Sequence, residues 1–256
     1  MGRPKAWLPW RGQPMLMHVV EVLRRVVSEV VVVTSAELDP PPVEARIVRD
    51  DTPGEGPLAG LAMGLEALQA DLAFATGTDV PYLSEAFVRA VLARGGAAAP
   101  VVDGFVQTLA AAYPKAAGER ARELLAAGRR RPLDLLEAED YAALAADDLP
   151  DLESLQGFNT PAAYLDAVRA DDPGALATLE FVGRPRGLAG VDSLRAPVGS
   201  LEEVLANAPG ALSLVEDGRV APPFIVSLGG RDFVRDGSIP IGAGERVIVL
   251  DASAGG

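Results

Sequence analysis

Residues 16–34 read LMHVVEVLRRVVSEVVVVT and contain two kinds of hydrophobic pattern in succession. The first part places apolar residues three and four positions apart, as on one face of a helix; these are Leu16, Val19, Val20, Leu23, Val26 and Val27. The second part, Val30 to Val33, is a short apolar run typical of a strand buried on both faces of a parallel sheet. A helix followed directly by such a strand indicates an α/β protein.

The same alternation of helix and strand continues downstream of this stretch. The next predicted elements are a helix over 58–68, a strand over 72–75, a helix over 84–94 and a strand over 98–102. Thr160 as N-cap and Pro161 at the first helical position predict one more helix. We therefore expect residues 1–172 to form a doubly wound α/β domain with a parallel-rich sheet.

A polar run, Arg169 to Gly174, ends in Pro-Gly and is typical of a linker. Beyond it, Ser200 and Glu203 form a capping-box pattern at the start of a short helix. Strands are predicted over 177–182, 211–215, 224–228 and 246–250, with turns at 217–218, 229–230 and 236–237. Strands followed by one helix and then by more strands predict a second domain, α+β in class, over 173–256.

Composition excludes several classes of function. Of the 256 residues, 49% are hydrophobic and 23% are charged, and a chain of this length and composition can form packed cores. A formal charge of −13 argues against a general nucleic-acid binder, and the absence of cysteine excludes disulfides and thiolate chemistry. His18 is the one histidine and cannot build a His-rich metal site; on an apolar helix it is expected to be structural. Without an apolar run of membrane-spanning length or a signal sequence, we expect a cytoplasmic protein with no membrane partner.

Three groups of residues in the first domain have side chains or backbone suited to a ligand. Downstream of Asp50, a loop becomes a helix at Gly56-Pro57-Leu58-Ala59-Gly60. The backbone N–H groups of such a helix start could bind an anion, or the segment could serve only to start the helix. Asp79 follows a buried strand and precedes a helix, where a carboxylate can hold Mg²⁺ or cap the helix. Lys5, near Pro9 and Trp10, could meet phosphates or remain solvated.

Taken in order, the short motifs of residues 1–168 resemble one family. The matching motifs are Met1-Gly2, Lys5 with Leu8-Pro9, Gly12 to Leu16 with His18, Asp50, Gly56 to Gly60, Thr78 to Leu83, Gly128 to Arg131, and Phe158 to Pro161. This series is similar to the MobA-type nucleotidyltransferases, which include molybdenum cofactor guanylyltransferase. An ordered series is more specific than any of its members.

The resemblance implies a Rossmann-like domain that transfers GMP from Mg²⁺-bound GTP to the terminal phosphate of molybdenum-bound molybdopterin, releasing pyrophosphate. It implies that Asp79 is the Mg²⁺ ligand, that Lys5 contacts the nucleotide phosphates, and that Asp50 and the Gly56 to Gly60 loop surround the nucleoside. Arg130, Arg131 and Asn159, with Arg129, are expected on the molybdopterin side. Such a transfer needs alignment and charge neutralisation more than a covalent catalyst, so Mg²⁺ and a lysine suffice.

One feature of the family is missing from the printed sequence. Members begin with a strand and the loop Leu-Ala-Gly-Gly-x-Ser-x-Arg before the position of Met1, and this loop gives backbone N–H groups to the nucleotide. We expect a start codon assigned too late, and in-frame translation upstream of Met1 to recover Leu-Ala-Gly-Gly. A stop codon there would leave a degenerate domain.

The C-terminal part ends in Gly255-Gly256, and a diglycine carboxylate can thread into the narrow active site of an adenylating enzyme. Before it lie motifs at 198–205, 224–228 and 241–250 that resemble the small MoaD/ThiS-type sulfur carriers of the molybdopterin-synthase and thiamine pathways. The resemblance implies a ubiquitin-like β-grasp domain whose terminal carboxylate becomes a thiocarboxylate. Its expected partners are an E1-like adenylating enzyme and the large subunit of molybdopterin synthase.

Two alternatives to this interpretation remain open. The first domain could transfer a cytidylyl group or act on a sugar phosphate, with the same fold. Alternatively, the first domain could be inactive and the chain could serve only as a carrier or binding module. The C-terminal resemblance does not separate the molybdopterin carrier from the thiamine carrier, although a neighbouring guanylyltransferase favours the former.

Overall fold

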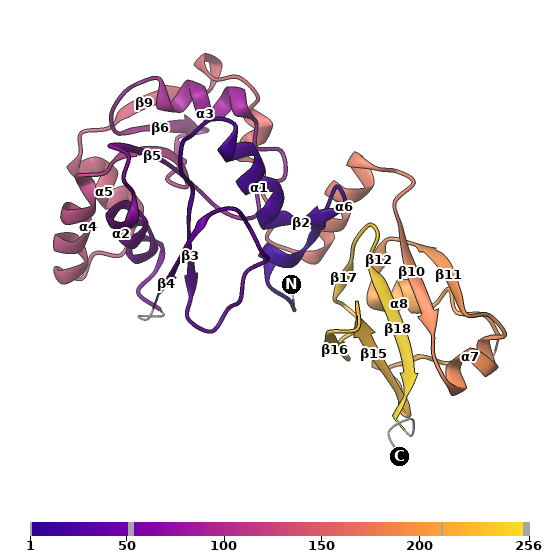
Figure 1. Ribbon diagram of the computed structural model, residues 1–256. Coiled ribbons are helices and arrows are strands. Elements are labelled where there is room, and N and C mark those ends of the chain that lie inside the picture. Colours follow the sequence, from indigo (N-terminus) through magenta and orange to yellow (C-terminus); the bar gives the residue numbers. More distant parts are fainter. Residues whose placement is uncertain (1, 51–53, 211, 253–256) are drawn as a thin grey trace. The chain divides into compact units, whose positions relative to one another are not determined.

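The computed structural model describes residues 2–50, 54–210 and 212–252, and these divide into two compact units (Figure 1). One unit is Met15–Gly157. The other joins Met1–Pro14 to Phe158–Gly256, so the first residues of the chain belong with its C-terminal region. Each unit is described separately below.

The unit Met15–Gly157 alternates helices with strands. Its helices are α1 (Met15–Arg24), α2 (Pro57–Ala67), α3 (Glu85–Leu92), α4 (Ala117–Ala126) and α5 (Pro132–Ala138). Its strands are β3 (Val31–Ser35), β4 (Arg46–Asp50), β5 (Leu72–Thr76), β6 (Ala98–Val102), β7 (Phe105–Val106), β8 (Ala110–Pro114) and β9 (Ala142–Ala145). Short 3-10 helices follow at Ala146–Asp148 and Leu152–Leu155. The three helices and three strands predicted before residue 103 are confirmed to within a few residues.

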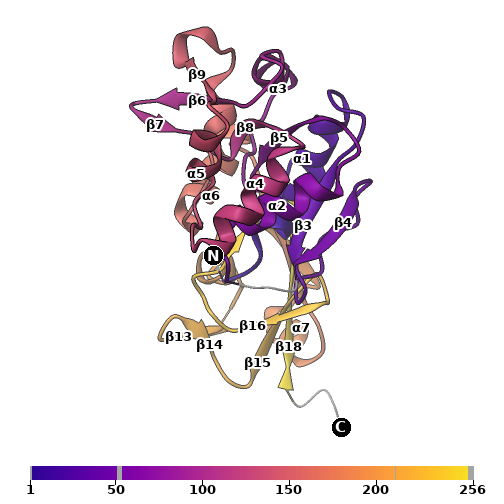
Figure 2. The ribbon, with the colours of Figure 1, turned by 90° about the vertical axis from the view of Figure 1, so that its left-hand side faces the viewer.

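The strands of this unit are mixed in direction, which corrects the expectation of a parallel-rich sheet. The pairs β3–β4 and β6–β9 are parallel (β3 and β4 lie side by side in Figure 2). In contrast, β8 runs antiparallel to both β5 and β6, and β7 runs antiparallel to β6. The cause is local: only a few residues connect β6, β7 and β8, and a parallel return needs a crossover of a dozen residues or more.

Helices cover both faces of this sheet, as the alternation along β8 shows. Ala111 and Tyr113 pack into a core with α2, α4 and α5, whereas Ala110 and Ala112 pack into a second core with α1 and α3. Because successive residues of a strand point to opposite faces, the two cores lie on opposite sides of the sheet. This is the layered α/β arrangement that the sequence predicts.

The described strands form two separate ladders in this unit. Among them, β3 pairs with β4 alone and β5 pairs with β8 alone. A cavity of about 280 Å³ lies between the two ladders, lined by apolar residues of β3, β5, α1 and α2. The sheet is therefore not continuous from β4 to β7 within the described part of the chain.

The second unit contains the N-terminal segment and the C-terminal strands. Its helices are α6 (Pro161–Asp171), α7 (Arg184–Ala189), α8 (Leu201–Leu205) and a 3-10 helix at Lys5–Trp7. Its strands are β1 (Pro9–Trp10), β2 (Gln13–Pro14), β10 (Leu176–Phe181), β11 (Ser193–Pro197), β12 (Gly199–Ser200), β13 (Val215–Glu216), β14 (Arg219–Val220), β15 (Phe224–Leu228), β16 (Asp232–Val234), β17 (Pro240–Ile241) and β18 (Arg246–Asp251).

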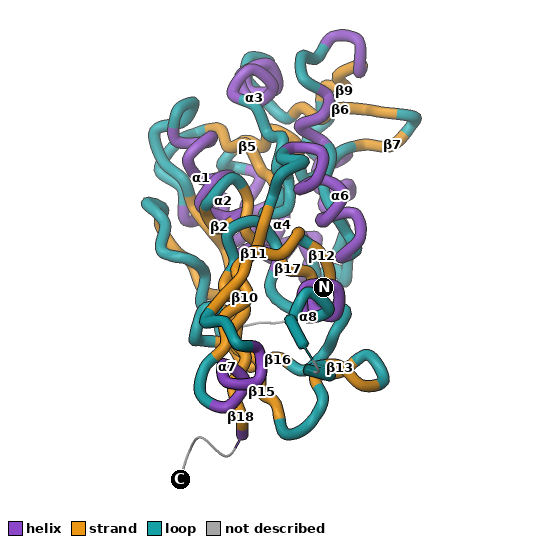
Figure 3. The backbone as a smooth tube through the Cα atoms, turned by 90° about the vertical axis from the view of Figure 1, so that its right-hand side faces the viewer, coloured by secondary structure: helices purple, strands orange, loops and turns teal. Residues whose placement is uncertain are grey.

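The main sheet of this unit has the order β11–β10–β18–β15–β16 (Figure 3 shows β10, β15 and β18 in orange). The last strand, β18, lies in the middle, parallel to β10 and antiparallel to β15. Alternate residues of β10 are buried and share a core with Leu201, Val204 and Leu205 of α8. The capping box at Ser200 and Glu203 starts α8 as predicted, with the Ser200 side chain accepting from the Glu203 N–H at 3.2 Å.

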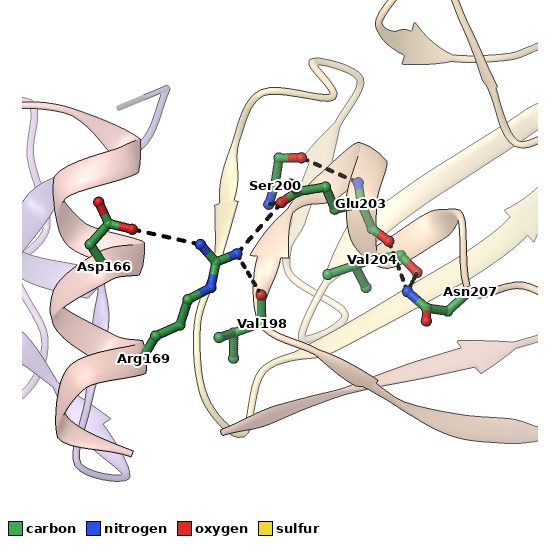
Figure 4. A network of polar contacts seen from close by, with 7 residues as sticks. All are labelled: Asp166, Arg169, Val198, Ser200, Glu203, Val204 and Asn207. Atoms are coloured by element: carbon green, nitrogen blue, oxygen red, sulfur yellow. Dashed lines mark hydrogen bonds and ion pairs between the residues drawn. The ribbon is translucent and has the colours of Figure 1, made fainter. Parts of the chain in front are cut away.

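Helix α6 is joined to the start of α8 by Arg169 (Figure 4). Its guanidinium donates to the Val198 carbonyl at 3.1 Å and lies 3.8 Å from the Glu203 carboxylate and 3.7 Å from Asp166. Thr160 caps α6 as predicted, since its side chain accepts from the Ala163 N–H at 3.1 Å. The interaction of Arg169 makes α6 part of the C-terminal unit.

Two sequence predictions in this unit are wrong in part. A linker is predicted over Arg169 to Gly174, but α6 continues through Asp171, and the Asp172 N–H still donates to the Val168 carbonyl at 2.9 Å. The strand predicted over 211–215 is reduced to β13, since Val215 and Glu216 form a hairpin with β14 while residues 212–214 carry no strand. No described helix has the length and apolar composition required to cross a bilayer.

Candidate functional site

Asp79 lies in the loop that follows β5, at the carboxyl end of that strand, as the sequence predicts. Two glycines approach it so closely that side chains there would collide. A Cβ on Gly77 would lie 2.9 Å from the Asp79 carboxylate, and a Cβ on Gly157 would lie 2.9 Å from its carbonyl oxygen. The half-buried Asp79 is therefore enclosed by backbone, which restricts the positions its carboxylate can take.

The segment after Asp79 is held by two buried or half-buried side chains. His18, on α1, places its Nε2 atom 3.0 Å from the Pro81 carbonyl, to which a protonated nitrogen donates. Ser154 is 1% exposed; its hydroxyl donates to the Tyr82 carbonyl at 3.2 Å and accepts from the Ser84 N–H at 3.0 Å. The contact of His18 supports the structural role expected of it, which is to hold the loop that follows Asp79.

Asp50 is the last residue of β4 and is half-buried. It pairs in register with Ser35, the last residue of the parallel strand β3. Its carbonyl accepts from the Ala36 N–H at 3.0 Å, which joins the two strand ends. Asp50 thus lies at the end of one strand and Asp79 just after the end of another.

The loop from Gly56 to Gly60 forms the start of α2. Gly56 is the N-cap, with a φ of 84° that favours glycine, and Pro57 occupies the first helical position. Leu58 and Ala59 point their side chains into the core, at 0% and 4% exposure, so only their backbone can meet a ligand. The helix-start turn is therefore present, and its N-terminal dipole is available for an anion.

The arginines of the 128–131 motif lie beside this helix start. A Cβ on Gly56 would lie 3.6 Å from the Arg130 carbonyl, and the Arg130 guanidinium is 3.5 Å from the Glu55 carboxylate. Arg129 and Arg131 instead approach Asp134, at 2.6 and 3.6 Å. The structure thus brings the predicted nucleoside loop together with one of the predicted molybdopterin-side arginines, Arg130.

Asp134 is a residue of this site that the sequence pattern does not reveal. Its side chain is 5% exposed, and the hydrogen bond from Arg129, with the charges of Arg129 and Arg131, holds its pKa below the usual range. The same hydrogen bond raises the pKa of Arg129. The only signal in the sequence is an acid three to five residues after two arginines at a helix start, which is a common arrangement.

Lys5 and Asn159, predicted on the nucleotide side and the molybdopterin side, lie together in the other unit. The Lys5 ammonium donates to the Asn159 side-chain oxygen at 3.1 Å. Phe158, next to Asn159, is 2% exposed and packs edge-on against Tyr164, with ring centroids 5.2 Å apart. Lys5 and Asn159 thus lie in the unit that contains Met1–Pro14, whereas Asp50, Asp79 and the arginines lie in Met15–Gly157. Gly255 and Gly256 lie outside the described residues.

Asp79 is a carboxylate, a type of ligand that Mg²⁺ accepts. Mg²⁺ is commonly held by one or two carboxylates with substrate phosphates and water. Within the described residues no group of three or more histidine, cysteine, aspartate or glutamate side chains could hold a metal. Substrate phosphates and water would therefore have to supply the other ligands of a Mg²⁺ ion at Asp79.

Residues 1–153 match the model of a known family, described as the MobA-like NTP transferase domain. This match covers more than half of the 256 residues. The chain belongs to the MobA-like NTP transferase family. It is accordingly a nucleotidyltransferase, as the order of its motifs predicts.

Relatives of this chain named molybdenum cofactor guanylyltransferase match more than half of its length. A probable molybdenum cofactor guanylyltransferase of Bacillus cereus is 29% identical over 177 residues, which cover 65% of this chain and 88% of the relative. A protein of the same name from Bacillus cytotoxicus is 30% identical over 156 residues, covering 57% of this chain and 78% of the relative.

Two solved structures share the fold of this MobA-like protein. One is molybdopterin-guanine dinucleotide biosynthesis protein A from Archaeoglobus fulgidus, with a TM-score of 0.56 and 20% identity, covering 66% of this chain and 91% of that one. The other is 2-C-methyl-D-erythritol 4-phosphate cytidylyltransferase from Thermus thermophilus, with a TM-score of 0.54 and 21% identity, covering 66% and 94%. The likeness concerns the Rossmann-like nucleotidyltransferase fold.

Proposed function

We propose that residues 1–172 catalyse Mg²⁺-dependent transfer of GMP from GTP to the terminal phosphate of molybdenum-bound molybdopterin. Membership of the MobA-like family and the names of the relatives support this substrate pair. The observation that carries the proposal is the Asp79 carboxylate, enclosed by Gly77 and Gly157 at the end of β5. A carboxylate with restricted freedom can keep a metal ion in place while substrate phosphates complete its coordination.

In this proposal each predicted residue has a separate task. Lys5, oriented by Asn159, contacts the nucleotide phosphates. Asp50 and the Gly56 to Gly60 helix start surround the nucleoside, while Arg130, close to that helix start, and Arg131 receive the phosphate of the acceptor. Asn159, which lies with Lys5, would contact the molybdopterin side through its amide.

The reaction is a displacement at the α-phosphorus of GTP. An oxygen of the acceptor phosphate forms a bond to that phosphorus, the bond to the β-phosphate oxygen breaks, and pyrophosphate leaves with its electron pair. Mg²⁺, when bound, neutralises the charge that develops on the phosphate oxygens. The protein supplies alignment through Lys5 and Asp79, and no covalent intermediate on a side chain is needed.

Replacement of Asp79 tests this function. We expect Asp79→Asn to lower Mg²⁺-dependent GMP transfer at least about 100-fold, because the amide cannot replace the charged ligand. Asp147→Asn, at an exposed carboxylate of the 146–148 turn, is the matched control and should keep full activity. Unchanged turnover in Asp79→Asn would remove Asp79 from the mechanism.

Nucleotide specificity separates this function from its alternatives. GTP, CTP, ATP and UTP are compared in a thermal-shift assay, because only a nucleotide that binds the folded state raises its stability. A shift with CTP instead of GTP would support the cytidylyl alternative. No shift with any nucleotide would support the alternative that the first domain is inactive.

We further propose that residues 173–256 form a ubiquitin-like β-grasp sulfur carrier. The favouring observation is the sheet order β11–β10–β18–β15–β16, with the last strand central and parallel to β10, and with α8 packed on one face. The carboxylate of Gly256 would be adenylated by an E1-like enzyme and ATP, and sulfur from a donor would then displace AMP. Its acceptor would be the large subunit of molybdopterin synthase.

Intact mass spectrometry tests the carrier function. After incubation with an E1-like adenylating enzyme, ATP and a sulfur donor, the chain should gain the mass difference between sulfur and oxygen. A variant extended beyond Gly256 should gain nothing, because its diglycine is no longer terminal. If the unextended chain also stays unchanged beside a functioning carrier, the carrier proposal is wrong.

A further inference from the structure

The segment that precedes α1 contains both tryptophans of the chain, Trp7 and Trp10, together with Lys5. Three separate contacts attach this segment to the strands and turns of the C-terminal region, within one compact unit. The contacts involve an ion pair, a cation–π interaction and a close approach of backbone. They bear on Lys5 because they lie on both sides of it in the sequence.

The first contact is the ion pair of Arg3 with Glu245. The two groups are 2.6 Å apart, and their side chains are only 15% and 12% exposed. Glu245 directly precedes β18, and its other carboxylate oxygen accepts from the Gly242 N–H at 2.7 Å. A largely buried pair with a second hydrogen bond is costly to break, because the remaining charge would be left without its partner.

The second contact is between Trp7 and Arg231. The Arg231 guanidinium lies over the Trp7 ring, 5.2 Å from its centroid, which is within the range of a cation–π interaction. Arg231 belongs to the turn between β15 and β16. Arg3 and Trp7 therefore bracket Lys5 at two residues on either side, and each is held by a different part of the C-terminal domain.

The third contact involves Pro9, Tyr164 and Gly242. The Tyr164 hydroxyl donates to the Pro9 carbonyl at 2.7 Å, and a Cβ on Gly242 would collide with that hydroxyl and lie 3.2 Å from Pro9. Burial, and then the Glu245 carboxylate, raise the pKa of Tyr164, so the phenol remains protonated at neutral pH. The N-terminal segment, α6 and the turn before β18 thus meet at one point.

We propose that the C-terminal domain positions Lys5 for nucleotidyl transfer, with Glu245 and Arg231 as the positioning residues. This inference rests on the proposed role of Lys5 at the nucleotide phosphates. Lys5 is part of a single 3-10 turn, Lys5–Trp7, so a shift of either flanking anchor displaces its ammonium and its contact with Asn159. The carrier-like domain would then be required for the activity of the first domain.

Tryptophan fluorescence and kinetics test the inference together. The variants are Glu245→Gln, Arg231→Ala and Arg231→Lys, with Glu180→Gln as the control. Glu180 also loses an ion pair, at 2.6 Å to Arg246, but that pair joins β10 to β18 within the sheet. Because Trp7 and Trp10 are the two tryptophans, emission and acrylamide quenching report on this segment.

We expect Glu245→Gln and Arg231→Ala to shift emission to longer wavelength and to lower kcat/KM for GTP about 10- to 100-fold, as for a misplaced positioning group. Arg231→Lys should restore much of both, since lysine keeps the cation, and Glu180→Gln should match the wild type. The inference would be overturned if Glu245→Gln and Arg231→Ala altered the fluorescence but left kcat/KM unchanged. It would also be overturned if these variants left the fluorescence unchanged.

The inference can fail separately from the proposed function. If wild-type protein binds GTP but transfers no GMP, the proposed function fails, and GTP affinity replaces kcat/KM as the readout for the same variants. Equal affinity in wild type and Glu245→Gln would then overturn the positioning role. If wild-type protein binds no GTP, both proposals are wrong.

Discussion

At the scale of single residues, backbone and buried polar side chains determine where the charged groups of the site can lie. Asp79 is enclosed by two glycines, and the loop after it is held by His18 and Ser154. None of these four neighbours carries the chemistry itself. They restrict the conformations of Asp79, and in the function proposed for Asp79 this restriction would lower the entropy cost of reaching a reactive geometry.

Asp134 provides a prediction about pH. Because Arg129 lowers its pKa in the folded state, its stabilising effect is present above the unfolded pKa, about 3.9, and is lost as pH falls through the lower folded value. Asp134→Asn should therefore lower the urea midpoint at pH 7 and reduce the difference between wild type and variant as the pH approaches about 3.

The measurement is urea unfolding of both proteins from neutral pH down to this acidic limit, with Asp147→Asn beside them as a surface carboxylate control. If the difference in urea midpoint between Asp134→Asn and wild type stays constant over this pH range, the ion pairs with Arg129 and Arg131 do not stabilise the fold. The rate of GMP transfer by Asp134→Asn would show whether Arg129 and Arg131 must be paired with Asp134 for activity.

At the scale of elements, the first unit is built from two ladders with a cavity between them. β3 and β5 each have one partner among the described strands, whereas β18 has β10 on one edge and β15 on the other. Residues of both β3 and β5 line this cavity. Unpaired strand edges open more easily than paired ones.

Amide hydrogen exchange tests this difference between strands. We expect the amides of β3 and β5 that do not bond to β4 or β8 to exchange faster than the central amides of β18, whose core residues Val247 and Val249 are 0% exposed. Equal protection of the three strands in the printed chain would contradict two separate ladders.

The elements also show which local signals are reliable. Helices with a side-chain cap are predicted correctly at their first residues, as for α6 after Thr160 and α8 after Ser200, because the cap bonds to its own next turn. The strand β8 is not predicted, since Ala110-Ala111-Ala112 has no strand preference of its own and is buried only by its neighbours.

At the scale of the whole molecule, the chain is divided in a way that does not follow its order. Residues before α1 belong to the same unit as β18, more than two hundred positions later. Such long-range contacts are specified by packing rather than by adjacent residues. They connect the proposed nucleotide-binding lysine to the proposed sulfur carrier in one compact body.

The amino-acid sequence by itself determined the alternation of helices and strands, the helix caps, and an ordered series of motifs that placed the chain among the nucleotidyltransferases. Those signals are local, because periodicity and capping act over a few residues. Only the tertiary structure decided that Gly157 encloses Asp79, that Asp134 anchors two arginines, and that Lys5 meets Asn159 across 154 positions. Such contacts depend on how distant segments pack, which no local pattern encodes.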